Sequence, residues 1–336
     1  MNFEQQLRYF QKSMQEVNAL TFDQRALELF AFQAKYNPLY GKFLTLLGRT
    51  PETVVSIAQI PFLPISLFKN KTIKTGNWTA ETLFESSGTT GQVTSKHEVR
   101  SLDWYKKTTV DGFQYFYGDP KDFCFLALLP SYLERSGSSL VLMADHFIRE
   151  SKYSESGFFL NDHDHLYQCL VNLKKENIPT ILIGVSFGLL DFIENYQIDF
   201  PDLIVMETGG MKGRRKELTR AALHKPMCDS FGLQTIHSEY GMTELFSQAY
   251  SKGHGRFQPA PTMKILVRDV SDPFYIIKKE RHGAINIIDL ANIDTCAFIA
   301  TDDLGRQFED DSFEVLGRLD ASDIRGCNLM VGEFAT

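Results

Sequence analysis

The middle of the chain, from about residue 80 to residue 246, alternates short apolar runs with segments of helical character. The apolar runs are FCFLALL (123–129), SSLVLMA (138–144), ILIGV (181–185) and LIVMETGG (203–210). The helical segments are 103–116, 166–175, GLLDFIEN (188–195) and KGRRKELTRAALHK (212–225). Strands buried on both faces read as continuous apolar runs, and helices connect parallel strands. The pattern therefore predicts a layered α/β fold around a largely parallel sheet.

The two ends of the chain differ from this middle part. Apolar residues spaced four and three apart predict an amphipathic helix at the start, followed by more helical sequence over 21–32; they are Phe3, Leu7, Phe10, Met14 and Val17. After residue 246 come short β-like pieces: MKILVRD (263–269), FYIIKK (274–279), GAINIIDL (283–290), FIATDDLG (298–305) and SFEVLGR (312–318). We expect one core over 1–316, made of a helical start at 1–50, α/β sheets over about 51–246 and a β-rich subdomain over about 247–316. Residues 317–336 are expected to form a hinge-like segment and a short tail.

The charge balance excludes several classes of partner. The chain has 35 Lys and Arg against 42 Asp and Glu, and its cations are scattered rather than gathered into the basic stripe that nucleic acid or anionic lipid requires. The longest apolar run, Phe123 to Leu129, is far shorter than the roughly 20 residues of a membrane-spanning helix. The first residues also lack the apolar core of a signal peptide. We expect a cytoplasmic protein without a nucleic-acid partner or a membrane span.

Cysteine and histidine give no metal-site pattern. The five cysteines contain no CxxC pair; they are Cys124, Cys169, Cys228, Cys296 and Cys327. The polar run NDHDH (161–165) reads as a solvated turn rather than as a metal site.

A loop made only of Gly and hydroxyl residues follows the strand-like TLFE (82–85). It reads Ser86, Ser87, Gly88, Thr89, Thr90, Gly91. Successive backbone N–H groups and hydroxyls in such a loop can turn toward one anion. It is not a Walker A loop, because no Gly-Lys-Ser/Thr ends it and Lys96 comes five residues after Gly91. Taken alone, the loop is equally consistent with a flexible surface turn.

Three further motifs give the loop a context. They are YGMTE (240–244), TDDLGR (301–306) and GRLD (317–320) followed by IRG (324–326). With SSGTTG, in this order, they resemble the motifs of the adenylate-forming superfamily, which includes acyl-CoA synthetases, adenylation domains and firefly-type luciferases. The resemblance implies the N-terminal core fold of these enzymes, ATP and Mg²⁺ as cofactors, and a carboxylic acid as substrate.

The resemblance also implies roles for individual residues. Ser86 to Gly91 would hold the β- and γ-phosphates, with Thr89 and Thr90 as hydroxyl donors. Tyr240 would lie against adenine, beside the turn at Gly209 and Gly210, and Thr243 would bond the α-phosphate. Glu244, a hard oxygen ligand, would hold Mg²⁺. Asp303 would accept from the ribose hydroxyls, and Arg318 would contact ribose or phosphate.

Two positions depart from the superfamily pattern. The usual lysine after the loop is Thr94 here, and the nearest cations, Lys96 and His97, are the candidates to replace it at the phosphates. In TDDLGR, Asp302 replaces a glycine and competes with Asp303 for the ribose role.

The end of the sequence refines the resemblance. Superfamily members carry a mobile C-terminal domain of roughly 100 residues, which we expect to be absent or reduced here. Sequences with IRGCNL (324–329) near the end resemble the LuxE-type acyl-protein synthetases, which transfer a fatty acyl group from AMP to their own cysteine. Cys327 stands at that place, and its thiolate would be the nucleophile. The acceptor thiol is thus Cys327, coenzyme A, a carrier protein or a partner reductase.

Two other hypotheses fit parts of the sequence. GVSFG (184–188) matches G-x-S-x-G between a strand and a helix, so Ser186 is a candidate nucleophile of a serine hydrolase or acyltransferase, with Asp229 and one of His237, His254 or His282. The second hypothesis is that the chain is a non-catalytic ATP- or acyl-binding module of the same fold.

Overall fold

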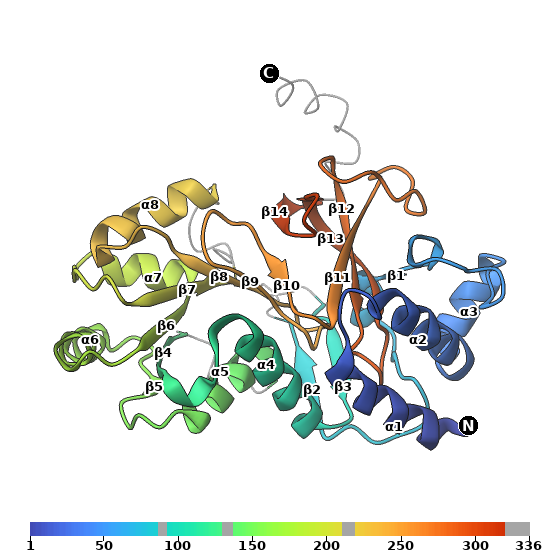
Figure 1. Cartoon of the computed structure of the whole chain (residues 1–336), viewed down its shortest axis with the longest axis horizontal. Helices are drawn as coiled ribbons and strands as arrows, with labels where there is room; N and C mark the ends of the chain where they lie inside the picture. Colours follow the sequence, from blue (N-terminus) through green and yellow to red (C-terminus); the bar gives the residue numbers. More distant parts are fainter. Residues whose placement is uncertain (87–92, 130–136, 210–218, 320–336) are drawn as a thin grey trace. The chain divides into compact units, whose positions relative to one another are not determined.

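The computed structural model describes residues 1–86, 93–129, 137–209 and 219–319 (Figure 1). The chain divides into two compact units, one formed by Thr79–Ala260 and the other by Met1–Trp78 together with Pro261–Thr336. The mixed α/β fold predicted from the sequence is confirmed.

The unit 79–260 is organised around a seven-stranded sheet with the order β10-β9-β8-β7-β6-β4-β5. Neighbours from β8 to β5 run parallel, whereas β9 and β10 are antiparallel additions. The strands are β4 (Cys124–Leu128), β5 (Gly157–Phe158), β6 (Thr180–Val185), β7 (Ile204–Thr208), β8 (His237–Tyr240), β9 (Ala249–Ser251) and β10 (Gln258–Pro259). All of β4 and β6 is buried, as continuous apolar runs predict for central parallel strands.

Helices and one hairpin complete this unit. The hairpin pairs β2 (Thr82–Glu85) with β3 (Lys96–Val99). The helices are α4 (Leu102–Tyr117), the short 3₁₀ helix η4 (Pro120–Asp122), α5 (Ser139–Glu150), α6 (His163–Glu176), α7 (Ser186–Ile193) and α8 (Arg220–Phe231). Side-chain oxygens cap several of them: Ser101 accepts from the Trp104 amide, and Asp162 accepts from the His165 amide. The NDHDH run thus contains the start of α6 rather than only a turn.

One apolar run adopts a different structure from the strand that we predicted. SSLVLMA (138–144) begins helix α5, capped by Ser138. The buried residues Met143, Ala144 and Phe147 recur at helical spacing once the following ADHFIRE is included. A short apolar run without flanking context fits a buried strand and a buried helix equally well, and here the continuing pattern decides for the helix.

The unit that contains both ends of the chain has its own five-stranded sheet. Its order is β1-β13-β12-β11, with β14 also paired to β13. The strands are β1 (Leu63–Pro64), β11 (Met263–Arg268), β12 (His282–Asp289), β13 (Phe298–Gln307) and β14 (Phe313–Arg318). The helices are α1 (Phe3–Ser13), α2 (Phe22–Tyr36) and α3 (Pro38–Leu46), with 3₁₀ turns at Met14–Glu16, Ile57–Gln59 and Ile65–Lys69.

Buried polar side chains in helix α2 and at its C-cap, Asn37, connect this helix to the segment between β12 and β13. Gln33 donates to the carbonyls of Asn292 and Ile293, and it accepts from the Ala297 amide at 2.9 Å. Asn37 donates to the Thr295 carbonyl at 2.9 Å. These bonds satisfy the backbone groups of a buried turn, which would otherwise destabilise the fold. They explain why residues near 33 and near 295 belong to one unit.

The FYIIKK piece does not form the strand that we predicted. Its regular pairing is limited to one isolated antiparallel bridge between Ile276 and Arg268. Phe274 and Tyr275 are half exposed, so the segment lacks the burial that stabilises a strand of this composition.

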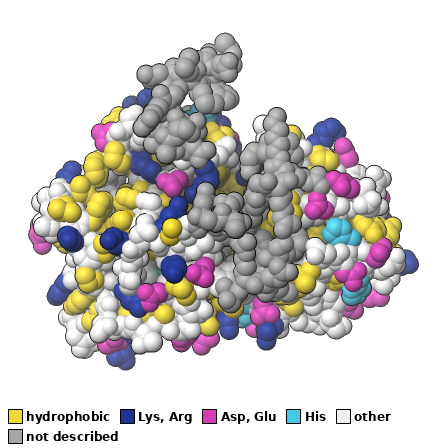
Figure 2. All heavy atoms as spheres, turned by 180° about the vertical axis from the view of Figure 1, so that it is seen from behind, with side chains coloured by type: hydrophobic (Ala, Val, Ile, Leu, Met, Phe, Trp, Pro, Cys, Tyr) yellow, Lys and Arg dark blue, Asp and Glu magenta, His cyan; other side chains and the backbone are white. Residues whose placement is uncertain are grey.

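The surface carries no large field of one sign in the view of Figure 2, where Lys and Arg side chains lie among Asp and Glu over the described residues. Within the described residues, no helix is both long and apolar enough to cross a membrane.

Candidate functional site

Three parallel strands of the unit 79–260 end beside one another. β6 ends at Val185, β7 at Thr208 and β8 at Tyr240, and these strands are adjacent in the sheet. Ligands of parallel α/β sheets bind at the carboxyl ends of the strands. Gly209, which follows β7, has φ = 67°, a left-handed conformation that glycine adopts without strain. The predicted residues Gly209, Tyr240, Thr243 and Glu244 therefore all follow or end strands at this edge.

A buried carboxylate, Glu207, connects the elements at this edge. Glu207 is 3% exposed and accepts hydrogen bonds from Arg220 and, at 2.9 Å, from the Ser238 hydroxyl. His224 Nε2 lies 3.4 Å from the same carboxylate. Burial alone raises the pKa of Glu207, but the bonds from His224, Arg220 and Ser238 together hold it below its usual value. Glu207 is therefore ionised and links β7 to β8 and to the first turns of α8.

The geometry around Ser186 argues against a serine hydrolase. The Ser186 hydroxyl lies 3.1 Å from a Glu207 carboxylate oxygen and 3.1 Å from the Gly209 carbonyl. The Glu207 carboxylate therefore lies between the Ser186 hydroxyl and the His224 imidazole. A catalytic triad needs the imidazole between the hydroxyl and the carboxylate. The side chain is only 2% exposed. Ser186 instead helps to hold the Gly209 turn.

A second buried carboxylate, Glu239, lies on the neighbouring strand. It accepts a hydrogen bond of 2.5 Å from the Thr208 hydroxyl. Burial, reinforced by the charge of Glu207, raises the pKa of Glu239 to about 7, although the Thr208 bond opposes the shift. A Cβ at Gly241 would collide with a Glu239 carboxylate oxygen, so a larger residue there would require the Glu239 side chain to shift.

Neither Glu207 nor Glu239 was among the residues that we singled out from the sequence. The available signal was the acidic residue inside an otherwise buried strand, in LIVMETGG and in HSEY. A carboxylate in such a position requires dedicated partners. Those partners, Arg220 and Thr208 among them, are identifiable only in the folded chain.

The two ends of the YGMTE segment are buried, whereas Gly241 is exposed and Met242 and Thr243 are partly exposed. Tyr240 is 9% exposed and Glu244 is 5% exposed. The Tyr240 ring lies 5.8 Å from the ring of Phe257. The Arg220 guanidinium lies over the Phe257 ring, 5.0 Å from its centroid. Tyr240, at the end of β8, thus packs against Phe257, which in turn contacts Arg220.

The β2–β3 hairpin carries the hydroxyl-rich loop. The Ser86 amide donates to the Ser95 carbonyl at 3.1 Å, and the Ser95 amide donates to the Ser86 hydroxyl at 2.8 Å. Lys96 is exposed and lies 4.0 Å from Glu85. His97, in contrast, is fully buried, and its Nδ1 lies 2.8 Å from the Thr243 carbonyl oxygen. The hairpin thus presents one of the two predicted cations to solvent and the other to the YGMTE segment.

The remaining predicted residues of the described chain lie in the other unit. Asp303 on β13 is directly opposite Arg318 on β14, with the Arg318 Nε 3.7 Å from an Asp303 carboxylate oxygen. Arg318 also lies 3.8 Å from Asp302. Asp303 is nearly buried whereas Asp302 is 43% exposed, because successive residues of a strand face opposite sides.

Several predicted residues lie outside the described part of the chain. They are Ser87, Gly88, Thr89, Thr90, Gly91, Gly210 and Cys327. The other four cysteines are free thiols, and burial raises the pKa of each, to about 12 for Cys124 and Cys296 and about 11 for Cys169. A thiol with a raised pKa is a poor nucleophile at neutral pH.

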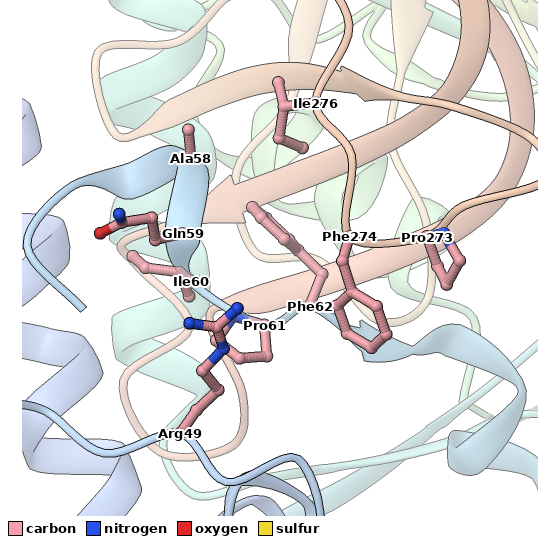
Figure 3. Close-up of a pocket in the computed structure, with 9 residues that line it drawn as sticks. All are labelled: Arg49, Ala58, Gln59, Ile60, Pro61, Phe62, Pro273, Phe274 and Ile276. Atoms are coloured by element: carbon pink, nitrogen blue, oxygen red, sulfur yellow. The ribbon is translucent and has the colours of Figure 1, made fainter. Parts of the chain in front are cut away.

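The described residues contain no cluster of three or more His, Cys, Asp or Glu side chains arranged to hold a metal ion. A small surface pocket of about 80 Å³ lies in the unit with both chain ends, and Figure 3 shows its lining by Arg49, Gln59, Pro61, Phe62, Phe274 and their neighbours. None of the described motif residues lines it, so we assign it no part in the site.

Solved structures identify the class of fold. The structure resembles a 2-hydroxyisobutyryl-CoA ligase in complex with 2-HIB-AMP and CoA, with a TM-score of 0.66, 14% identity, and coverage of 90% of this chain and 69% of that one. It also resembles ATP-bound MatB from Rhodopseudomonas palustris, with a TM-score of 0.53, 17% identity, and coverage of 70% and 47%. The chain therefore has the fold of the N-terminal core of adenylate-forming enzymes, and it spans about half the length of MatB.

The family follows from the sequence match. Residues 6–336 match the family described as acyl-protein synthetase, LuxE, so the chain belongs to that family. A comparison with curated protein sequences finds no significant match. The LuxE-type resemblance and the adenylate-forming core fold that the sequence indicated are thus confirmed.

Proposed function

We propose that this chain activates a carboxylic acid, a fatty acid in the first instance, with MgATP and transfers the acyl group to a thiol. In the first step a carboxylate oxygen attacks the α-phosphorus, the bond to the bridging oxygen breaks, and pyrophosphate leaves. In the second step a thiolate attacks the carbonyl carbon of the acyl-AMP, and AMP leaves with the former carboxylate oxygen. Membership of the LuxE family over nearly the whole chain is the observation that carries the proposal.

The chemistry of the motif residues supports this reaction. Ser86 and Thr243 offer hydroxyl groups, and Glu244 offers the hard carboxylate oxygens that Mg²⁺ prefers. Mg²⁺, when bound, neutralises phosphate charge during the displacement. We propose that Tyr240 lies against the adenine, whose flat ring complements an aromatic face held by Phe257. The Gly209 turn would provide backbone without a side chain next to that base.

The loop and the cations have separate proposed roles. Residues 86–91 would bind the β- and γ-phosphates through hydroxyl and N–H donors. Lys96, exposed on the hairpin, is the better candidate for a phosphate contact than His97, because His97 is buried against Thr243. Asp303 would accept from the ribose hydroxyls. Arg318 would contact ribose or phosphate, since its guanidinium is 69% exposed.

We propose Cys327 as the acceptor thiol. Two observations support it: the IRGCNL context, and the raised pKa of the four described cysteines, which disfavours their thiolates. Coenzyme A, a carrier-protein thiol and a partner reductase are the competing acceptors. The 2-hydroxyisobutyryl-CoA ligase was solved with 2-HIB-AMP and CoA, which makes coenzyme A the first of the competing acceptors to test.

The decisive experiment is ATP–pyrophosphate exchange with a panel of carboxylic acids. Exchange requires only the first step, so it is independent of the acceptor. We expect exchange with long-chain fatty acids and weaker exchange with short or aromatic acids. ATP binding without exchange for any acid would replace this proposal by the non-catalytic binding module.

A further inference from the structure

His97 occupies a position that a phosphate-binding cation would not. On β3 the exposure alternates, so Lys96 faces outward while His97 and Val99 face the interior. The His97 side chain is completely buried. Its ring lies 5.2 Å from the ring of Phe246 and 6.5 Å from the ring of Phe84. The imidazole is therefore part of an aromatic core within the unit 79–260.

A polar contact of His97 determines which ring nitrogen carries a proton. Its Nδ1 lies 2.8 Å from the carbonyl oxygen of Thr243. A carbonyl oxygen only accepts, so Nδ1 must carry the proton and donate it. The neutral ring with its proton on Nδ1, as well as the charged ring, satisfies this contact. The contact thus requires a donor at this position, not a charge.

The bond connects two segments that are 146 positions apart in the sequence. On one side is the β2–β3 hairpin, whose last pairs are Glu85 with Lys96 and Ser86 with Ser95. On the other side is the segment that follows β8 and contains Thr243 and the buried Glu244. Within this unit the His97 bond is a direct polar link between the arm of the hydroxyl-rich loop and the backbone of YGMTE.

We propose that His97 is a positioning residue for adenylation: its Nδ1–H bond holds the Thr243–Glu244 backbone at a fixed place relative to the β2–β3 hairpin. The inference rests on the proposed function, because it assigns the hairpin and Thr243–Glu244 to one reaction. Catalysis by positioning is sensitive to displacement, and a misplacement of about 1 Å costs on the order of a hundredfold in rate. His97 acts through Thr243 and Glu244 and does not itself touch the substrate.

The test compares His97→Asn with His97→Leu. The Asn amide nitrogen is as many bonds from Cβ as Nδ1, so Asn retains the donor, whereas Leu has a similar branched shape without one. We expect kcat of pyrophosphate exchange to fall by about tenfold to a hundredfold in the Leu variant and by less than about threefold in the Asn variant. The KM for the carboxylic acid should stay unchanged in both. Equal losses in Asn and Leu, or a folded Leu variant with normal kcat, would overturn the inference.

A packing control separates positioning from general destabilisation. Val99 is fully buried on the same face of β3, so Val99→Ala weakens the packing beneath this strand without removing the bond. We expect it to lower the melting temperature while kcat stays near that of the wild type. If Val99→Ala lowers kcat as much as His97→Leu, packing alone explains the effect and the positioning role is rejected.

Amide hydrogen exchange provides a readout that needs no activity. Loss of the bond should speed exchange in a peptide spanning 241–246 in His97→Leu, relative to wild type and His97→Asn. Identical amide hydrogen exchange in all three proteins would reject the positioning role. If the wild type shows no pyrophosphate exchange with any acid, the proposed function is rejected instead. The amide hydrogen exchange measurement would still test whether His97 holds the Thr243 backbone.

Discussion

Glu239 on β8 accepts a 2.5 Å hydrogen bond from the hydroxyl of Thr208, the last residue of the neighbouring strand β7. Glu207, two residues from the Gly209 turn, lies on the same pair of strands but is bonded to Arg220, Ser238 and His224. The two buried carboxylates therefore have opposite properties. Glu207 is stabilised as an anion, whereas burial raises the pKa of Glu239 to about 7.

The raised pKa of Glu239 predicts a specific dependence of stability on pH. An unfolded Glu has a pKa of about 4.3, so the folded chain binds a proton at Glu239 more tightly than the unfolded chain does. This tighter proton binding stabilises the fold only at a pH where Glu239 is protonated. The contribution is full below about pH 4.3 and is lost as the pH rises through about 7, and it is on the order of 3 kcal/mol. Glu239→Gln should therefore be more stable than wild type at pH 8.5 and similar to it near pH 5, measured by urea unfolding.

Glu207→Gln is the matched control on the adjacent strand. Since the pKa of Glu207 is lowered, its contribution is present above the unfolded pKa and disappears as the pH falls. Glu207→Gln should therefore be less stable than wild type at neutral pH, because Arg220 loses its buried partner. A Glu239→Gln variant that is destabilised equally at pH 5 and pH 8.5 would contradict the raised pKa.

Glu244→Gln tests the metal ligand that we propose. Loss of one negative charge from a Mg²⁺ ligand should reduce pyrophosphate exchange by about a hundredfold or more, because the metal stabilises the charge of the displacement. The exchange should recover in part at high Mg²⁺ concentration. Glu155→Gln, an exposed acidic residue outside the motifs, is the control and should exchange normally. Near-normal exchange by Glu244→Gln would remove the residue from the metal site.

Cys327→Ser tests the acceptor. The variant should retain pyrophosphate exchange, because adenylation precedes the thiol step, but should lose the hydroxylamine-labile acyl label on the protein. Cys228→Ser is the control, since Cys228 is a partly exposed thiol whose pKa is raised. If intact-mass measurement shows the same acyl adduct, in the same yield, on the Cys327→Ser variant as on the wild type, Cys327 is not the acceptor. Consumption of coenzyme A with no labelled protein would assign transfer to a soluble thiol.

Ser186→Ala distinguishes a structural serine from a nucleophile. Its hydroxyl contacts Glu207 and the Gly209 carbonyl, so its loss should lower the free energy of unfolding by about 1 kcal/mol. Pyrophosphate exchange should fall by less than about threefold. The discriminating measurement is hydrolysis of a p-nitrophenyl ester by both proteins. An esterase activity that is present in the wild type and absent from the variant would restore the hydrolase hypothesis.

Sequence patterns predicted those elements whose environment is uniform along their length. Buried parallel strands need apolar residues on both faces, so FCFLALL and ILIGV predicted β4 and β6 without further context. The ordered motifs from SSGTTG to GRLD predicted the superfamily, and IRGCNL predicted the LuxE-type family that the match over residues 6–336 confirms. Local patterns failed where two structures fit equally, as in SSLVLMA, which helical continuation and the Ser138 cap turn into α5.

The partners of polar residues depended on the folded chain. Nothing near His97 in the sequence indicates that its ring donates to a carbonyl 146 positions away, and nothing near Glu207 indicates its bond with Arg220. Residues 1–78 join residues after 260 because Gln33 and Asn37 bond the backbone between β12 and β13. A buried strand or helix needs apolar residues at regular positions within its own short segment, so the periodicity of the sequence reveals it. A hydrogen bond requires a donor and an acceptor within about 3 Å, a condition that only long-range folding fulfils.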